Sequence, residues 1–277
     1  MQFNAKTKNE KRLAGWFSAL STALTMVLTA AALSAVTTAP VMGQTTGCTL
    51  ATVKGNYGVL ASGTALGIGP VTAVGDATLD GAGHETYTAT ENYNGEIIPG
   101  ILTGTYTLSS SCTGTVTVPG FADYAAVVVN AGQEIDLIGT SNPGTAIVQT
   151  AVAKRIGIPT TPGCSLSTVK GNYGVLGSGT SAGEPLTAVG LLTLDGAGNL
   201  TYAVTENAAG YMVSGTFPGT YTLSSNCTGT VTIPEAPSGS LTFAAVVVDG
   251  GQQIYIMGAT TSVPPPIFQT AVAKKIN

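Results

Sequence analysis

Few side chains in this 277-residue sequence have a type and spacing that could support chemistry. The single histidine, His84, aligns with Asn199 when the two halves of the chain are compared, and one histidine forms neither a metal cluster nor a catalytic triad. Glu91 and Glu206 recur in the tripeptide Thr-Glu-Asn and could act as general acids, but no second acid recurs beside them. We therefore predict no catalytic residue, no metal site and no cofactor.

Recurring tyrosines are the other candidates for contact with a ligand, because an aromatic ring can stack against a bound molecule or fill a core. They are Tyr57, Tyr87 and Tyr106 in the first half, with Tyr173, Tyr202 and Tyr221 at the equivalent positions in the second. Together with Glu91 and Glu206 they form our predicted ligand-binding set, and core packing is the alternative role for the tyrosines.

Two further pairs of charged residues have a structural explanation. Asp80 and Asp195 each begin the tetrapeptide Asp-Gly-Ala-Gly, which is typical of tight turns and lacks the alternating acids of a calcium loop. Lys54 and Lys170 are expected to lay their aliphatic stems along the protein surface.

The N-terminus is interpreted as a signal peptide over residues 1–43, because a basic region is followed by a small apolar segment at 16–36 and a cleavage site before Gln44. An apolar segment of this length, near the about 20 residues of a membrane span, makes an uncleaved anchor the alternative. A lipoprotein site at Cys48 is disfavoured, because the equivalent cysteine of the second repeat, Cys164, has no signal sequence before it. We expect a secreted, periplasmic or cell-surface protein with no membrane span after cleavage, and disulfides rather than free thiols.

Charge excludes some partners. Ten Lys and Arg and fourteen Asp and Glu residues are present; four of the bases and Glu10 precede Gln44, so six bases face thirteen acids and the net charge is −7. Without a basic patch the chain is not expected to bind nucleic acid. The many glycines and β-branched residues, with few charged ones, favour strands.

The chain is an internal duplication, which predicts two small domains. The repeated segments are VKGNYGVL at 53–60 and 169–176, LDGAG at 79–83 and 194–198, AAVVV at 125–129 and 244–248, and QTAVAK at 149–154 and 269–274. The segment at 104–119 also returns at 219–234. The domains are predicted at 44–156 and 164–277, with a proline-containing linker at 157–163.

Each repeat reads as eight short strands with Gly-rich turns, so we predict an all-β fold of two tandem eight-stranded antiparallel up-and-down β-barrels. The predicted strands of the first repeat are Tyr57–Gly63, Ala73–Leu79, Glu85–Thr90, Leu102–Leu108, Thr113–Val118, Tyr124–Val129, Glu134–Ile138 and Ala146–Ala153. A Greek-key sandwich of immunoglobulin type is the alternative. An outer-membrane barrel is disfavoured because outward positions are largely Thr, Ser and Glu.

Cysteine positions agree with an up-and-down order of strands. In such a meander the start of the first strand and the turn between the fourth and fifth lie at the same end, so Cys48 can pair with Cys112 and Cys164 with Cys227. Four cysteines allow three pairings, and the duplication favours this one. The bridge would draw a helical turn at Thr49–Lys54, ending at Gly55, across that end as a plug.

Length differences between the repeats fall in three connections: Ala65–Pro70, Pro119–Tyr124 and Gly139–Gln149. All three belong to the end away from the cysteines, as does Asn92–Pro99, predicted as a loop of constant length and variable sequence. Variable loops on a rigid scaffold often carry binding residues, so we predict the ligand site there.

The motifs C-x-L-x-T-V-K-G-x-Y-G, L-D-G-A-G, G-T-Y-T-L-x-S-x-C-T-G-T-V-T and A-V-A-K-[RK] resemble those of exported bacterial proteins of unknown function, which are similar to the allene oxide cyclase or lipocalin-like barrel group. The resemblance covers nearly all of the mature chain and implies one eight-stranded barrel per repeat. It implies no cyclase activity, because motifs of the plant cyclases are not visible.

These observations support three hypotheses. The first is an exported non-catalytic protein that binds a small apolar or sugar-like ligand at the variable end, the second a structural or adhesive surface protein, and the third an isomerase or cyclase by fold analogy alone. An interior cavity of a few hundred cubic ångströms would favour binding, and a filled interior the structural role.

Overall fold

The computed structural model describes residues 47–141, 147–159, 163–181, 183–235, 239–259 and 267–276. The predicted signal peptide lies outside the described residues, and so do positions 142–146 of the predicted connection Gly139–Gln149. None of the helices in the described part of the chain is long and apolar enough to cross a membrane.

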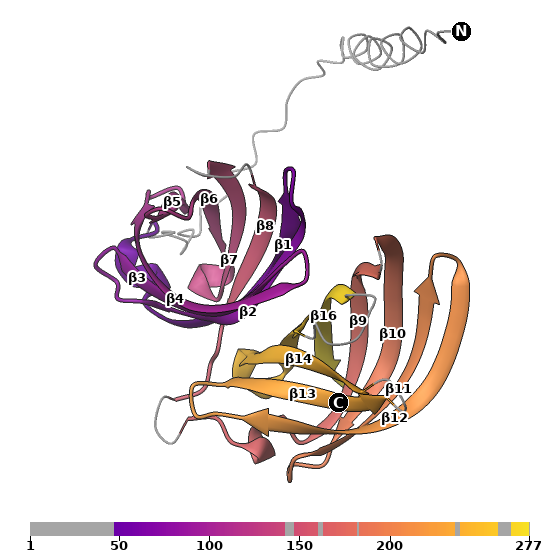
Figure 1. The fold of residues 1–277 in the computed structure, drawn as a ribbon. Helices are drawn as coiled ribbons and strands as arrows, with labels where there is room; N and C mark the ends of the chain where they lie inside the picture. Colours follow the sequence, from indigo (N-terminus) through magenta and orange to yellow (C-terminus); the bar gives the residue numbers. More distant parts are fainter. Residues whose placement is uncertain are drawn as a thin grey trace, which may run out of the picture. The chain divides into compact units, whose positions relative to one another are not determined.

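The first repeat is a closed barrel in which each strand pairs antiparallel with the next, and β1 pairs with β8 to close it (Figure 1). Its strands are β1 (Gly55–Ala65), β2 (Gly69–Leu79), β3 (His84–Tyr93), β4 (Glu96–Leu108), β5 (Thr113–Val118), β6 (Ala122–Val129), β7 (Glu134–Ser141) and β8 (Ile147–Arg155). The predicted up-and-down order is confirmed, and the sandwich alternative is wrong.

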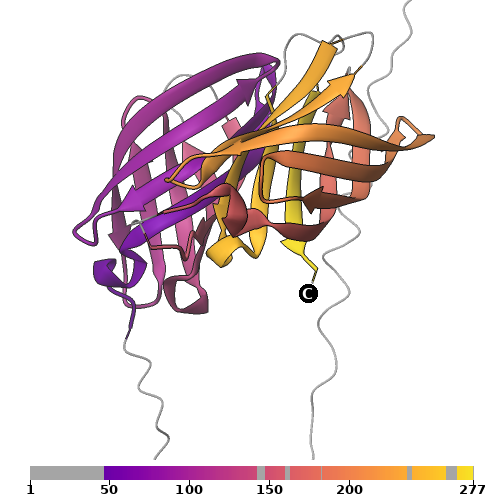
Figure 2. The ribbon, with the colours of Figure 1, turned by 90° about the horizontal axis from the view of Figure 1, so that it is seen from below.

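The second repeat forms a second closed barrel with the same order, closed by β16 on β9 (Figure 2). Its strands are β9 (Gly171–Ser181), β10 (Glu184–Leu194), β11 (Asn199–Ala208), β12 (Tyr211–Leu223), β13 (Thr228–Glu235), β14 (Gly239–Val248), β15 (Gln253–Gly258) and β16 (Ile267–Lys275). The fold class expected from the sequence is therefore confirmed for both repeats.

Alternation along the strands explains why these sequences close into barrels. Side chains of a strand point alternately to opposite faces, so Val59 and Ala61 of β1 face the interior, as do Val116 and Val118 of β5, and all four are buried. Full closure leaves no strand edge exposed to other chains.

The two disulfides join the predicted pairs, Cys48–Cys112 and Cys164–Cys227, each with 5.0 Å between Cα atoms. We call the end that holds each disulfide the floor of its barrel, and the opposite end the rim. The predicted plug is a 3-10 helix, η1 (Leu50–Val53), and Val53 is buried in the core of the first barrel. The floor is thus closed by a covalently attached segment.

Near the rim the strands extend further than the sequence suggests. The predicted loop Asn92–Pro99 is wrong, because β3 continues to Tyr93 and β4 begins at Glu96. Only Asn94 and Gly95 form the turn, with φ of 47° and 99°, which is the positive-φ pair that a two-residue hairpin requires. Strand pairing continues past the point where hydrophobic alternation fades, because a tight turn holds the register.

Candidate functional site

A cavity of about 80 Å³ lies inside the first barrel, and we call it the first cup. Most of its wall is aliphatic and comes from inward positions of the strands. Its polar and aromatic lining residues are Glu85, Tyr87, Glu91, Phe121, Tyr124 and Gln149. Only Phe121 of these belongs to a connection between strands, and the other five stand on the strands themselves.

Strand β3 supplies both carboxyl groups of the first cup. Glu85, Tyr87 and Glu91 share one face because they are separated by even numbers of residues, and that face points into the barrel. Six residues of strand place the Cα atoms of Glu85 and Glu91 about 20 Å apart, so the two acids stand at different depths of the barrel.

Burial changes the protonation of both acids. It raises the pKa of Glu85 to about 7. Burial also raises the pKa of Glu91 to about 7, against the opposing effect of a hydrogen bond with Tyr93. Burial and then the Glu91 charge hold the pKa of Tyr87 well above its usual range. Near neutral pH the two carboxyls therefore exist in both protonation states and can donate or accept a hydrogen bond.

A second polar pair faces the same cavity from other strands of the closed barrel. The Tyr124 hydroxyl on β6 donates a hydrogen bond of 2.9 Å to Oε1 of Gln149 on β8. Gln149 is only 4% exposed. A buried amide needs partners, and this bond fixes its orientation at the cavity wall.

The second barrel has a cavity of about 130 Å³, the second cup, with a different polar lining. Glu206, Tyr202 and Gln269 correspond to Glu91, Tyr87 and Gln149 and line it. Burial, followed by the charge of Glu206, raises the pKa of Tyr202 to about 12.

Two substitutions between the repeats make the second cup less polar. Leu200 stands where the first barrel has Glu85, and Phe243 where it has Tyr124. The second cup therefore has one carboxyl group where the first has two. It also lacks a phenol equivalent to that of Tyr124, which bonds to Gln149 in the first cup.

Four of the six predicted tyrosines lie at the floor instead of at a cup, and only Tyr87 and Tyr202 line a cup. Tyr57 is fully buried, and its hydroxyl donates to the Gly132 carbonyl at 2.6 Å; Tyr173 does the same to Gly251 at 2.8 Å. Their hydroxyls are held by the backbone, so their place in the structure is that of core residues.

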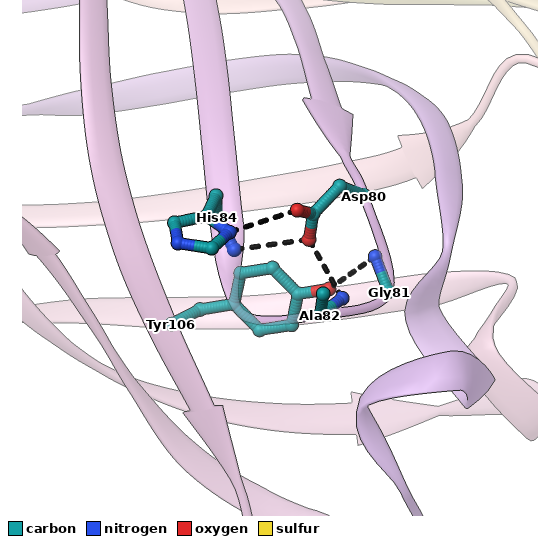
Figure 3. Close-up of polar contacts among 5 residues, drawn as sticks. All are labelled: Asp80, Gly81, Ala82, His84 and Tyr106. Carbon is teal, nitrogen blue, oxygen red and sulfur yellow. Dashed lines mark hydrogen bonds and ion pairs between the residues drawn. The ribbon is translucent and has the colours of Figure 1, made fainter.

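The Tyr106 hydroxyl accepts a hydrogen bond of 2.8 Å from the backbone N–H of Gly81 (Figure 3). Tyr221 accepts the equivalent bond from Gly196 at 2.9 Å. Each of these tyrosines anchors the neighbouring Asp-Gly-Ala-Gly turn at the floor.

The predicted turn role of Asp80 is confirmed by its contacts, which Figure 3 shows. Its carboxylate accepts bonds from the backbone N–H groups of Ala82 (2.7 Å) and His84 (3.0 Å) and lies 2.9 Å from Nδ1 of His84. The backbone N–H groups of His84 and Ala82, then the His84 ring, hold the pKa of Asp80 well below its usual range. His84 is exposed, and within the described residues no group of three His, Cys, Asp or Glu side chains could hold a metal ion.

Glu85, Tyr124, Gln149 and Gln269 are lining residues that the sequence reasoning missed. The signal for Glu85 was available, since it shares the even spacing of Tyr87 and Glu91 on one strand. Gln149 and Gln269 are the first residues of the repeated segment QTAVAK. A single polar residue at the edge of an alternating apolar segment does not show by itself whether its side chain faces the barrel interior or the solvent.

Comparison with known proteins places the chain in no established family. No protein-family model matches it, and no curated protein matches its sequence. The closed sheets confirm the eight-stranded barrel that the sequence resemblance implies. Membership in the allene oxide cyclase or lipocalin-like group is not established.

Among solved structures, kievitone hydratase from Nectria haematococca is 11% identical, with a TM-score of 0.30 over 85% of this chain and 93% of that one. A protein of unknown function from the DUF3598 family of Nostoc punctiforme is 9% identical, with a TM-score of 0.29 over 82% and 97%. CghA with Sch210972 is 7% identical, with a TM-score of 0.26 over 80% and 88%. These similarities are too low to carry an argument about activity.

Proposed function

We propose that this chain is an exported binding protein in which each barrel holds a small, mostly apolar molecule in its own cup. The observation that carries the proposal is the buried polar set in the first cup: Glu85, Glu91, Tyr124 and Gln149 face a cavity inside an otherwise apolar barrel. Burying carboxyl groups costs free energy, and such costs are concentrated at functional sites.

The lining limits the chemistry of the ligand. The first cup has two carboxyls and no lysine or arginine in its lining, so it favours a hydroxyl or amino group and disfavours an anion. The second cup, with one carboxyl and two phenylalanines, suits a more apolar ligand. In both cups an aliphatic body would lie against the valines and alanines of the wall.

Cavity size limits the ligand further. The two volumes, about 80 and 130 Å³, are below the few hundred cubic ångströms expected for a drug-sized ligand. We therefore propose a ligand of few heavy atoms, or one whose apolar end alone enters the barrel.

The same volumes favour a second candidate, a structural or adhesive role outside the cell, because a nearly filled barrel is a stable building block. The proposal of export rests on the predicted signal sequence and on the two disulfides, which are typical of oxidising compartments. Recovery of a secreted chain that begins at Gln44 would test export directly.

A thermal-shift series separates the two candidates. Cyclohexanol, benzyl alcohol and cyclohexylamine are expected to raise the melting temperature by several degrees at saturation, and cyclohexanecarboxylate at pH 8 is the control that should not. Ala151→Leu fills only the first cup and its twin Ala271→Leu only the second, so each should abolish binding in one barrel. If none of the compounds stabilises the protein, the binding proposal fails and the structural role is favoured.

A further inference from the structure

Both barrels belong to the single unit Thr45–Asn277, and they contact each other through the outer faces of their sheets. From the first barrel, Val74 on β2 is 2% exposed although it points outward, with Leu60 and Val152 packed beside it. We call this surface the donor face. It packs against a surface of the second barrel that we call the acceptor face. The acceptor face lies on β14 and β15 and comprises Ala244, Val246, Val248, Tyr255 and Met257.

Close approach of the backbone makes this contact tight. A Cβ added at Gly58 of the donor face would lie 2.3 Å from Cγ1 of Val248 and 3.0 Å from the methyl groups of Val246. Asn92 is fully buried there and donates a hydrogen bond of 3.1 Å to the carbonyl of Gly258. The absence of a side chain at Gly58 is therefore a condition of the contact.

The duplication gives the second barrel its own copy of the donor face. Leu176, Val189 and Gly174 are identical to Leu60, Val74 and Gly58 at the equivalent positions, and Leu191 replaces Asp76. Leu176 is 70% exposed and Val189 58%. An added Cβ at Gly174 would meet only one atom, a carbonyl oxygen 4.0 Å away, so this face is open.

The first barrel likewise has its own copy of the acceptor face. Val127 and Val129 correspond to Val246 and Val248, and Ile138 corresponds to Met257. Val127 is 45% exposed and Ile138 53%, whereas Val246 and Met257 are fully buried. One chain thus exposes both halves of a contact that it already forms internally.

We propose that this protein associates head to tail with further copies of itself, the free donor face of one second barrel packing on the free acceptor face of the next first barrel. Such a contact joins two different surfaces, so it propagates as a filament unless the rotation between copies closes a ring. Exposed apolar patches of this kind mark interaction sites. The internal contact shows that a donor face is covered by an acceptor face.

The polar contacts at the margin of the internal contact are not repeated between the free faces. We therefore expect the contact between two copies to be weaker than the contact within one chain. Inside the chain, Asn226 bonds to Asp76 at 3.2 Å and Lys154 lies 3.4 Å from Asp249. Between copies, Asp249 is replaced by Asn130, and Tyr255 of the acceptor face by Asp136. Assembly should therefore depend on protein concentration.

Sedimentation of the exported chain from micromolar to submillimolar concentration tests the proposal. The wild type is expected to form a series of oligomers. Leu176→Lys removes the free donor face and Val127→Lys the free acceptor face, and each should raise the dissociation constant by at least about tenfold. Met212→Lys, at a 65% exposed apolar residue of β12 that belongs to neither face, is the matched control and should associate like the wild type.

Mixing the two variants identifies the mode of contact. Each variant retains the face that the other lacks, so an equimolar mixture should form a heterodimer and stop there. A wild type that stays monomeric over the whole range would overturn the proposal. So would association that survives either single substitution, since two like faces or an exchange of whole barrels would then be responsible.

Discussion

The guanidinium of Arg155 lies over the ring of Tyr57, with Cζ 5.0 Å from the ring centroid, and its Nη2 donates a hydrogen bond of 2.9 Å to the Tyr57 hydroxyl. The same side chain donates to the carbonyls of Lys54 (2.7 Å), Thr52 (3.3 Å) and Gly132 (3.3 Å). Arg155 therefore joins the plug, the last strand and the floor turn of the first barrel.

Arg155→Ala should destabilise the first barrel by about 2–4 kcal/mol, because several partly buried acceptors lose a charged donor at once. In the second barrel Lys275 takes this place, with Nζ 5.8 Å from the centroid of Tyr173. Lys275→Ala should cost less, about 0.5–1 kcal/mol for a single cation–π contact. Urea unfolding of both variants measures the difference, and equal losses would contradict the role of Arg155 as the floor anchor.

Protonation of Glu91 should make stability fall as pH rises. The folded protein holds the proton up to a pKa of about 7, whereas the unfolded chain releases it near its ordinary value of 4.5, so between these values the folded state binds more protons. The free energy of unfolding should therefore be highest below about pH 4.5 and decrease toward pH 7, by up to about 3 kcal/mol for this buried group.

Glu91→Gln should reduce the slope of that dependence by about half, because glutamine does not titrate while Glu85, whose pKa burial also raises to about 7, keeps its own contribution. Glu96→Gln, at an exposed carboxyl on the neighbouring strand, is the matched control and should leave the slope as it is in the wild type. Urea unfolding at a series of pH values provides the measurement. A slope unchanged in Glu91→Gln would show that this carboxyl ionises as readily in the folded protein as in the unfolded chain.

Each disulfide should stabilise its own barrel by about 4 kcal/mol, since it closes a loop with a sequence separation of 64 or 63 residues. Cys48→Ser with Cys112→Ser should lower the stability of the first barrel alone, and the equivalent pair at Cys164 and Cys227 that of the second. Hydrogen exchange resolves the two barrels. Loss of protection in both barrels from one pair of substitutions would contradict separate locking.

The close contact at Gly58 predicts opposite outcomes for twin substitutions. Gly58→Ala should cost about 1–3 kcal/mol, because the new methyl group overlaps Val248 of the acceptor face. Gly174→Ala should leave thermal stability near that of the wild type, since the equivalent space is open. Melting curves of the two variants decide this, and equal destabilisation would show that the donor face is not closely packed.

The amino-acid sequence by itself determined the architecture. The duplication, the period-two alternation and the glycine-rich turns specified two meanders, and the position of Cys112 between the fourth and fifth strands specified the disulfide. These are local or pairwise signals, and each fixes a direction or a neighbour without reference to the rest of the fold.

Only the tertiary structure decided which side chains share a space. Tyr57 and Tyr87 are both recurring tyrosines of predicted strands, yet the first is sealed at the floor and the second lines a cup, because depth along a closed barrel depends on the tilt and register of all eight strands. Val74 and Val189 occur at the same point of the repeat, yet one is buried and the other exposed. That difference arises because the first is covered by the other barrel, a contact that the repeat pattern alone cannot assign to one copy.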